Sequence, residues 1–161
     1  QNPNIFVFPL SQNFKMSKKN PVFEDIFKVE KIQSDYFPKV PRIKAVSEYH
    51  KNVEIELDVN FEVYLMKKDL NYRIALATNL SEDGIDRGGI YNSEDFEKES
   101  LMDKYEYCMY GKVFKIEEKK DPKQLQVHAS FGGLLMNLKG DPATLSIIPN
   151  DSRIYILIKQ T

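Results

Sequence analysis

Residues 125–141 contain the pattern that most constrains the fold, because two alternating segments meet there at a pair of glycines. Before the pair, every second residue is apolar, as in a half-buried strand: Leu125, Val127, Ala129 and Phe131. After it, the same period continues with Leu134, Met136 and Leu138. Gly132 and Gly133 lack a Cβ and suit a tight turn or the close approach of another backbone. The segment therefore predicts two adjoining strands and contains no catalytic motif.

Period-two alternation recurs along most of the chain. Its longest run covers residues 53–65, where seven consecutive odd-numbered positions are apolar and acidic or amide side chains lie between most of them. This run predicts one long strand whose polar face contacts either solvent or a cationic partner. Shorter strands are expected at residues 23–32, 42–46, 72–78, 105–116 and 152–159, with a bulge at Gly111 in the fourth of them. About eight strands without a long amphipathic helix predict an all-β fold, a closed antiparallel barrel.

Two segments differ in composition from these strands. Residues 1–21 contain three prolines and many amides, and we expect them to form a flexible leader, with Met16 as the native start. Residues 79–104 are rich in acidic side chains and glycine. They are expected to form an acidic loop that is partly disordered or carries a short helical turn, and that is either a solvated insertion or an interaction arm. The barrel domain is then expected to cover residues 22–161.

Charge and residue types argue against most kinds of chemistry. The formal net charge is −1, so no overall field favours nucleic acid or membrane as a partner. One cysteine and two histidines cannot form an ordinary tetrahedral zinc site, and no other metal or cofactor site is expected. Cys108 is expected to be a buried structural thiol, and His128 lacks a partner that would make it a general base. No apolar run approaches the ~20 residues of a membrane span.

Two kinds of binding surface are compatible with the strands. Aromatic side chains interleave with lysines, so Lys112, Phe114 and Lys139 could pair with phosphates and stack on the bases of a single-stranded nucleic acid. Leu135 instead falls on the polar face of its strand beside Asn137 and Lys139. An exposed apolar side chain at that position favours another protein chain as the partner.

Three motifs resemble the eighth-subunit family of eukaryotic nuclear RNA polymerases, the small subunit shared by polymerases I, II and III. They are YCMYGKVFKIE at residues 107–117, SFGGLLMNLKGD at residues 130–141 and DSRIYILIK at residues 151–159. Shorter matches occur in the same order at residues 23–27, 57–60 and 82–84, so the resemblance covers about residues 22–159. Cys108 stands where an aliphatic residue is usual, and the acidic loop matches only in part.

This resemblance implies an OB-fold-like barrel in the nucleus, held stably by the largest polymerase subunit, with catalysis left to the two large subunits. We therefore expect a non-catalytic structural subunit common to RNA polymerases I, II and III that supports transcription, without cofactors. The alternative is a stand-alone OB-fold protein that binds single-stranded nucleic acid, and a weak contact of that kind is also considered within the polymerase.

The partner-binding site is expected at the glycine corner. There, two glycines would let a partner backbone approach, and an exposed strand edge could pair with a partner strand. The residues expected to form it are Tyr110, Gly111, Phe131, Gly132, Gly133, Leu134, Leu135 and Met136.

Overall fold

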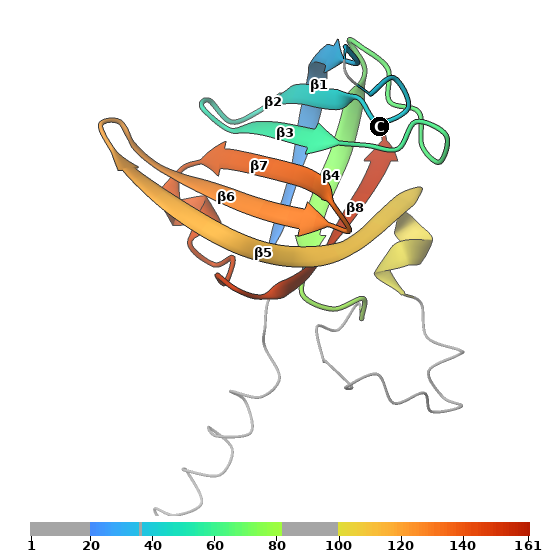
Figure 1. Cartoon of the computed structure of the whole chain (residues 1–161). Coiled ribbons are helices and arrows are strands. Elements are labelled where there is room, and N and C mark those ends of the chain that lie inside the picture. The colour runs from blue at the N-terminus through green and yellow to red at the C-terminus, as the bar shows by residue number, and fades with distance from the viewer. Residues whose placement is uncertain (1–19, 36, 82–99) are drawn as a thin grey trace, which may run out of the picture.

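The computed structural model describes residues 20–35, 37–81 and 100–161, and eight antiparallel strands within them close into a barrel (Figure 1). The order around the barrel is β1-β2-β3-β7-β6-β5-β8-β4. The strands are β1 Phe23–Gln33, β2 Arg42–Ser47, β3 Glu54–Asp58, β4 Asn71–Ala77, β5 Tyr107–Lys120, β6 Lys123–Phe131, β7 Leu134–Gly140 and β8 Arg153–Gln160, with short helices η2 Leu101–Lys104 and α2 Pro142–Leu145. The predicted all-β closed barrel is confirmed.

Most of the barrel core consists of inward-facing residues that the alternation predicted. On β8, Ile154, Ile156 and Ile158 are all fully buried. On β6, Val127 and Ala129 are likewise fully buried, so each strand contributes one inward row. Burial of one such isoleucine stabilises the fold by roughly 1.5–3 kcal/mol. Inward packing of every second residue fixes strand register, because a one-residue slip would expose the whole row.

The β6–β7 hairpin turns at the double glycine, as predicted. Phe131 pairs with Leu134 across a two-residue loop, and φ is +62° at Gly132 and +96° at Gly133. Two consecutive positive φ values are those of the type I′ hairpin turn, which glycine adopts without steric cost. The Ser130 hydroxyl accepts a hydrogen bond from the Gly133 N–H at 3.2 Å. The glycines are therefore required by the turn itself.

The single long strand predicted over residues 53–65 is wrong beyond Asp58. The Asn60 side chain accepts a hydrogen bond from the Glu62 N–H, and the Asn60 carbonyl accepts one from the Val63 N–H. Such a side-chain-capped turn competes directly with an extended strand. The chain therefore folds back, and Val63 and Leu65 are 67% and 55% exposed instead of facing the core.

The bulge in β5 lies at Phe114 and not at the predicted Gly111. The β5–β6 register shifts between Val113 and Lys115. Odd-numbered residues of β5 face the core before this point and even-numbered residues face it afterwards. Gly111 has a different role, because a Cβ at this position would lie 2.1 Å from the Ser130 carbonyl oxygen. β5 also extends to Lys120, which makes it a long curved strand that wraps across the barrel (Figure 1).

A second, smaller core lies outside the barrel, where η2 covers the outer faces of β4 and β8. It comprises buried Ala75, Ala77, Leu101 and Leu157. Ser100 caps η2 by accepting from the Met102 N–H, while the Asp103 side chain accepts from the Ser100 N–H.

A short helical turn, one of the two alternatives expected within residues 79–104, is present as η2. The acidic residues 82–99 and most of the predicted leader, residues 1–19, lie outside the described part of the chain. No helix among the described residues is long and apolar enough to span a membrane.

Candidate partner-binding corner

The glycine corner places two of its predicted side chains at the surface and two in the core. Tyr110 is 47% exposed and Leu135 is 43% exposed. Phe131 and Met136 are instead buried in the barrel, where they could contact a partner only after the barrel opened. Their part in the predicted site is therefore to hold the hairpin in place. Leu134 is half-buried against the core.

A network of hydrogen bonds fixes Leu135 relative to β3. Its N–H donates to the Asp58 carboxylate at 3.0 Å, and the same carboxylate accepts two bonds from the Arg42 guanidinium at 2.9 and 3.2 Å. Bidentate arginine–carboxylate pairs of this kind are directional and strong. The exposed leucine side chain consequently projects from a rigid support.

Among the described residues, the first part of β5 has a strand neighbour on one side only. Residues 107–112 pair with β8, whereas pairing with β6 begins at Lys112. Tyr110 lies in this stretch, and a Cβ on the next residue, Gly111, would lie 2.8 Å from the Cα of Phe131, the residue before the Gly132-Gly133 turn. The Tyr110 ring packs on Tyr155 with 4.6 Å between centroids, and the Arg153 guanidinium lies 5.9 Å from the Tyr110 ring centre. The corner thus combines a one-sided strand segment with a supported aromatic side chain.

The corner glycines differ in what an added side chain would meet. At Gly111 a Cβ would collide with the backbone of Ser130 and Phe131, so this glycine is required by the barrel. At Gly132 and Gly133 no atom lies within 4 Å of an added Cβ. The space beside the turn is therefore open to a partner backbone.

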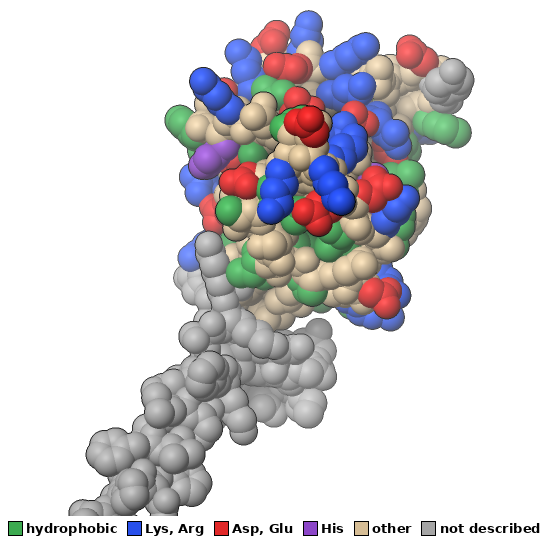
Figure 2. All heavy atoms as spheres, turned by 90° about the vertical axis from the view of Figure 1, so that its left-hand side faces the viewer, with side chains coloured by type: hydrophobic (Ala, Val, Ile, Leu, Met, Phe, Trp, Pro, Cys, Tyr) green, Lys and Arg blue, Asp and Glu red, His purple; other side chains and the backbone are tan. Residues whose placement is uncertain are grey.

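About half of the charged side chains on β2, β3, β5, β6 and β7 form ion pairs with described residues. Two carboxylates of β3 have the cationic partner that was one of the two expectations for this face: Glu56 pairs with Lys44 at 3.7 Å and Asp58 with Arg42 at 2.9 Å. Figure 2 shows basic and acidic side chains interspersed over one side of the barrel. No large patch of a single sign is visible there.

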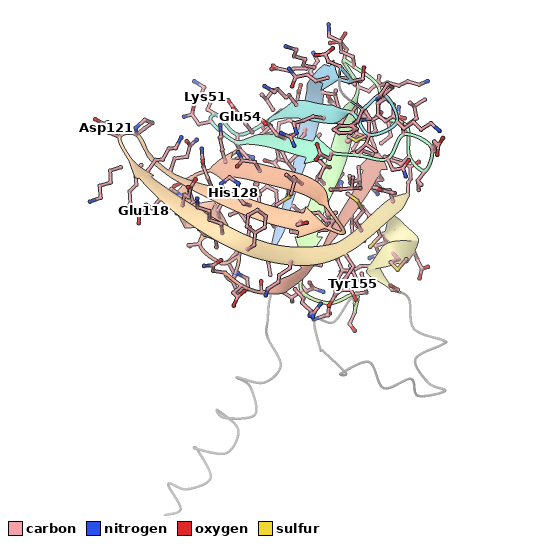
Figure 3. All side chains as sticks on the ribbon, in the orientation of Figure 1. Lys51, Glu54, Glu118, Asp121, His128 and Tyr155 are labelled. Atoms are coloured by element: carbon pink, nitrogen blue, oxygen red, sulfur yellow. The ribbon has the colours of Figure 1, made fainter. Side chains whose placement is uncertain are left out.

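His128 is half-buried on this face and has a carboxylate partner that the sequence did not reveal. Its Nε2 lies 3.2 Å from Glu117, whose carboxylate also pairs with Lys115 at 2.7 Å. Lys115, and to a lesser extent His128, hold the pKa of Glu117 below its usual value. Figure 3 shows His128 on the outer surface formed by β6 and its neighbours.

Of the two lysines predicted to bind nucleic acid, one forms an ion pair with a described residue. Lys112 pairs with Asp151 at 2.9 Å, and Lys139 lies opposite Glu54 and Gln126 in the sheet. Phe114 is 52% exposed and is the one member of the predicted set suited to stacking. A phosphate at Lys112 would have to displace its carboxylate partner.

Cys108 is half-buried in the small outer core, and desolvation raises the pKa of its thiol. A raised pKa disfavours the thiolate that nucleophilic chemistry needs. Among the described residues, no three His, Cys, Asp or Glu side chains are grouped so that they could hold a metal ion.

The sequence of this chain matches the model of one protein family, described as RNA polymerase Rpb8, over residues 24–160. A relative in Dictyostelium discoideum, the "DNA-directed RNA polymerases I, II, and III subunit rpabc3", is 40% identical over 142 residues, which cover 86% of this chain and 96% of the relative. The Arabidopsis thaliana "DNA-directed RNA polymerases II, IV and V subunit 8B" is 41% identical over 86% of this chain and 95% of its own. The Saccharomyces cerevisiae "DNA-directed RNA polymerases I, II, and III subunit RPABC3" is 33% identical over 88% of this chain and 99% of its own.

Proposed function

This chain belongs to the RNA polymerase Rpb8 family, and we propose that it is a non-catalytic structural subunit of the nuclear DNA-directed RNA polymerases I, II and III. In this role it docks on the largest subunit and supports transcription by bracing a region of that subunit. The named functions of the relatives, each of them a polymerase subunit, support the assignment.

The observation that carries the docking site is the glycine corner with its exposed side chains. Leu135 and Tyr110 project from a closed barrel and are each supported by fixed neighbours. When a partner covers these two side chains, they lose little conformational entropy, because the neighbours that hold them are already ordered. The one-sided segment of β5, residues 107–111, could in addition pair with an extended partner strand.

Affinity purification tests the proposal. The tagged chain, isolated from a nuclear extract, is expected to bring down the two large polymerase subunits in stoichiometric amounts. The variant Leu135→Ser combined with Tyr110→Ala should recover much less of both. Ile147→Ser is a matched control, since Ile147 is 46% exposed but follows α2, beyond the other end of β7. Purification of the wild-type chain without either large subunit would refute the proposed function.

The alternative, a stand-alone protein that binds single-stranded nucleic acid, retains one favourable observation, the exposed ring of Phe114. The pairing of Lys112 with Asp151 weakens it. Titration of the free chain with short single strands at several salt concentrations separates the two functions. Tight binding with a steep salt dependence would favour the alternative, whereas we expect weak binding.

A further inference from the structure

The main chain of β5 bonds to β8 at its odd-numbered residues. The Val113 N–H donates to the Ser152 carbonyl at 2.8 Å. The same register pairs Tyr107, Met109 and Gly111 with residues of β8. Hydrogen-bonded and non-hydrogen-bonded pairs alternate along an antiparallel ladder. The N–H and C=O groups of the even-numbered residues therefore point to the other side of β5.

On that other side, the start of β5 has an open edge. β6 pairs with β5 only from Lys112 onward, because the turn at Gly132 and Gly133 ends β6 there. The next even-numbered residues are Tyr110 and Cys108, and among the described residues no main-chain group pairs with them on this side. Tyr110 is 47% exposed, so this part of β5 lies at the surface. The N–H and C=O groups of these two residues are thus available to another strand.

Aromatic side chains lie on both faces of the sheet at this edge. Tyr107 is half-buried on the core side and stacks on Tyr64, with 5.2 Å between ring centres. Tyr110 is on the outer side, where it packs on Tyr155. Side chains alternate between the two faces of a strand. A strand placed beside β5 would therefore contact aromatic surface with both of its faces.

A peptide main chain is the chemical complement of this edge, because it carries one donor and one acceptor per residue. A nucleic acid binds instead through phosphates, which require cations. Near the edge, Lys112 is paired with Asp151, and Arg153 lies against the Tyr110 ring. Four further lysines lie toward the opposite ends of β5, β6 and β7: Lys119, Lys120, Lys123 and Lys139.

We infer that an extended segment of the polymerase partner adds a strand to β5, with hydrogen bonds to the main chain of Cys108 and Tyr110. The main-chain bonds supply affinity, and apolar side chains of the segment supply specificity by packing on Tyr107 and Tyr110. The inference rests on the proposed function and names the groups of β5 that receive the partner.

Amide exchange read at single residues, in the free chain and in purified polymerase, tests the inference. In the free chain, the amides of Cys108 and Tyr110 should exchange at least about a hundredfold faster than those of Tyr107 and Met109, which bond to β8. In polymerase, the same two amides should slow by at least about a hundredfold, because each then donates to the partner strand.

A pair of variants at Tyr110 isolates the main-chain contact. Tyr110→Ala and Tyr110→Pro both lose the ring, but only proline also lacks the N–H. The two variants are expressed together at equal levels with different tags, and their ratio is measured in the purified polymerase. We expect about tenfold more of the alanine variant, because the proline variant cannot donate to the partner strand and its ring obstructs the approach. The urea midpoints of the two free variants should agree within about 0.5 M, because proline is tolerated where an edge N–H faces solvent.

The outcomes separate this inference from the proposed function. Failure of the wild-type chain to enter polymerase would refute the proposed function. Normal entry without slower exchange at Cys108 and Tyr110 would overturn the inference alone, and so would equal incorporation of the two variants. Slow exchange of both amides in the free chain would also overturn it, because the edge would then be closed. Protection of these amides by a single-stranded oligonucleotide, but not by polymerase, would identify nucleic acid as the occupant instead.

Discussion

Of all the single glycine-to-alanine replacements at the corner, Gly111→Ala should destabilise the barrel most. The new Cβ would lie 2.1 Å from the Ser130 carbonyl oxygen and 2.8 Å from the Phe131 Cα. Both contacts involve backbone, so β6 would have to move by about 1 Å in a tightly packed region. Overpacking of this kind costs typically about 1–3 kcal/mol, and we expect about 3 kcal/mol because no flexible side chain can yield.

Urea unfolding followed by far-ultraviolet circular dichroism measures this loss. With an m-value of about 2 kcal/mol/M, the midpoint of Gly111→Ala should fall by about 1.5 M. Gly140→Ala is the matched control, because its Cβ would meet the end of the Leu145 side chain at 3.1 Å and no backbone within that distance. That variant should lose no more than about 1 kcal/mol. Equal midpoints for the two variants would refute the assignment of Gly111 to a close backbone approach.

Three further predictions concern other parts of the fold. Leu57→Ala should cost about 2–5 kcal/mol in urea unfolding because Leu57 is a core residue, whereas Leu65→Ala, at an exposed position, should stay within about 0.5 kcal/mol of the wild type. Lys115→Ala should raise the pKa of Glu117 toward its ordinary value in an NMR titration. The pKa of Glu117 is lower in the folded than in the unfolded chain. The ionised Glu117 side chain therefore stabilises the fold at pH values above its unfolded-state pKa, and this stabilisation is lost as the pH falls through its folded-state pKa. Ser100→Ala should remove the cap of η2 at a cost of about 1 kcal/mol, visible as faster amide exchange in that turn.

Most of the barrel could be predicted from alternation, because inward and outward residues differ consistently in polarity. The row formed by Ile154, Ile156 and Ile158 and the turn at Gly132-Gly133 follow from local sequence alone. The end of β3 could not be predicted from local sequence in this way. Val63 and Leu65 continue the apolar period, and only the hydrogen bonds of the Asn60 turn stop the strand.

The candidate site was predictable only in part. Strand parity placed Leu135 at the surface and Phe131 and Met136 in the inward rows, as the structure has them, so the last two were included in the contact set against their own parity. The pairing of Lys112 with Asp151 joins residues far apart in sequence, so it could not be foreseen from either one.

Hydrogen exchange of the free and the polymerase-bound chain tests the central claim, that this barrel docks through the glycine corner. On assembly, the account predicts slower amide exchange at residues 107–111, whose strand lacks a second neighbour, and at residues 132–137. The amides of β4, which pair on both sides within the barrel, should change little. Unchanged exchange at both corner segments, with new protection confined to other surfaces, would contradict the account.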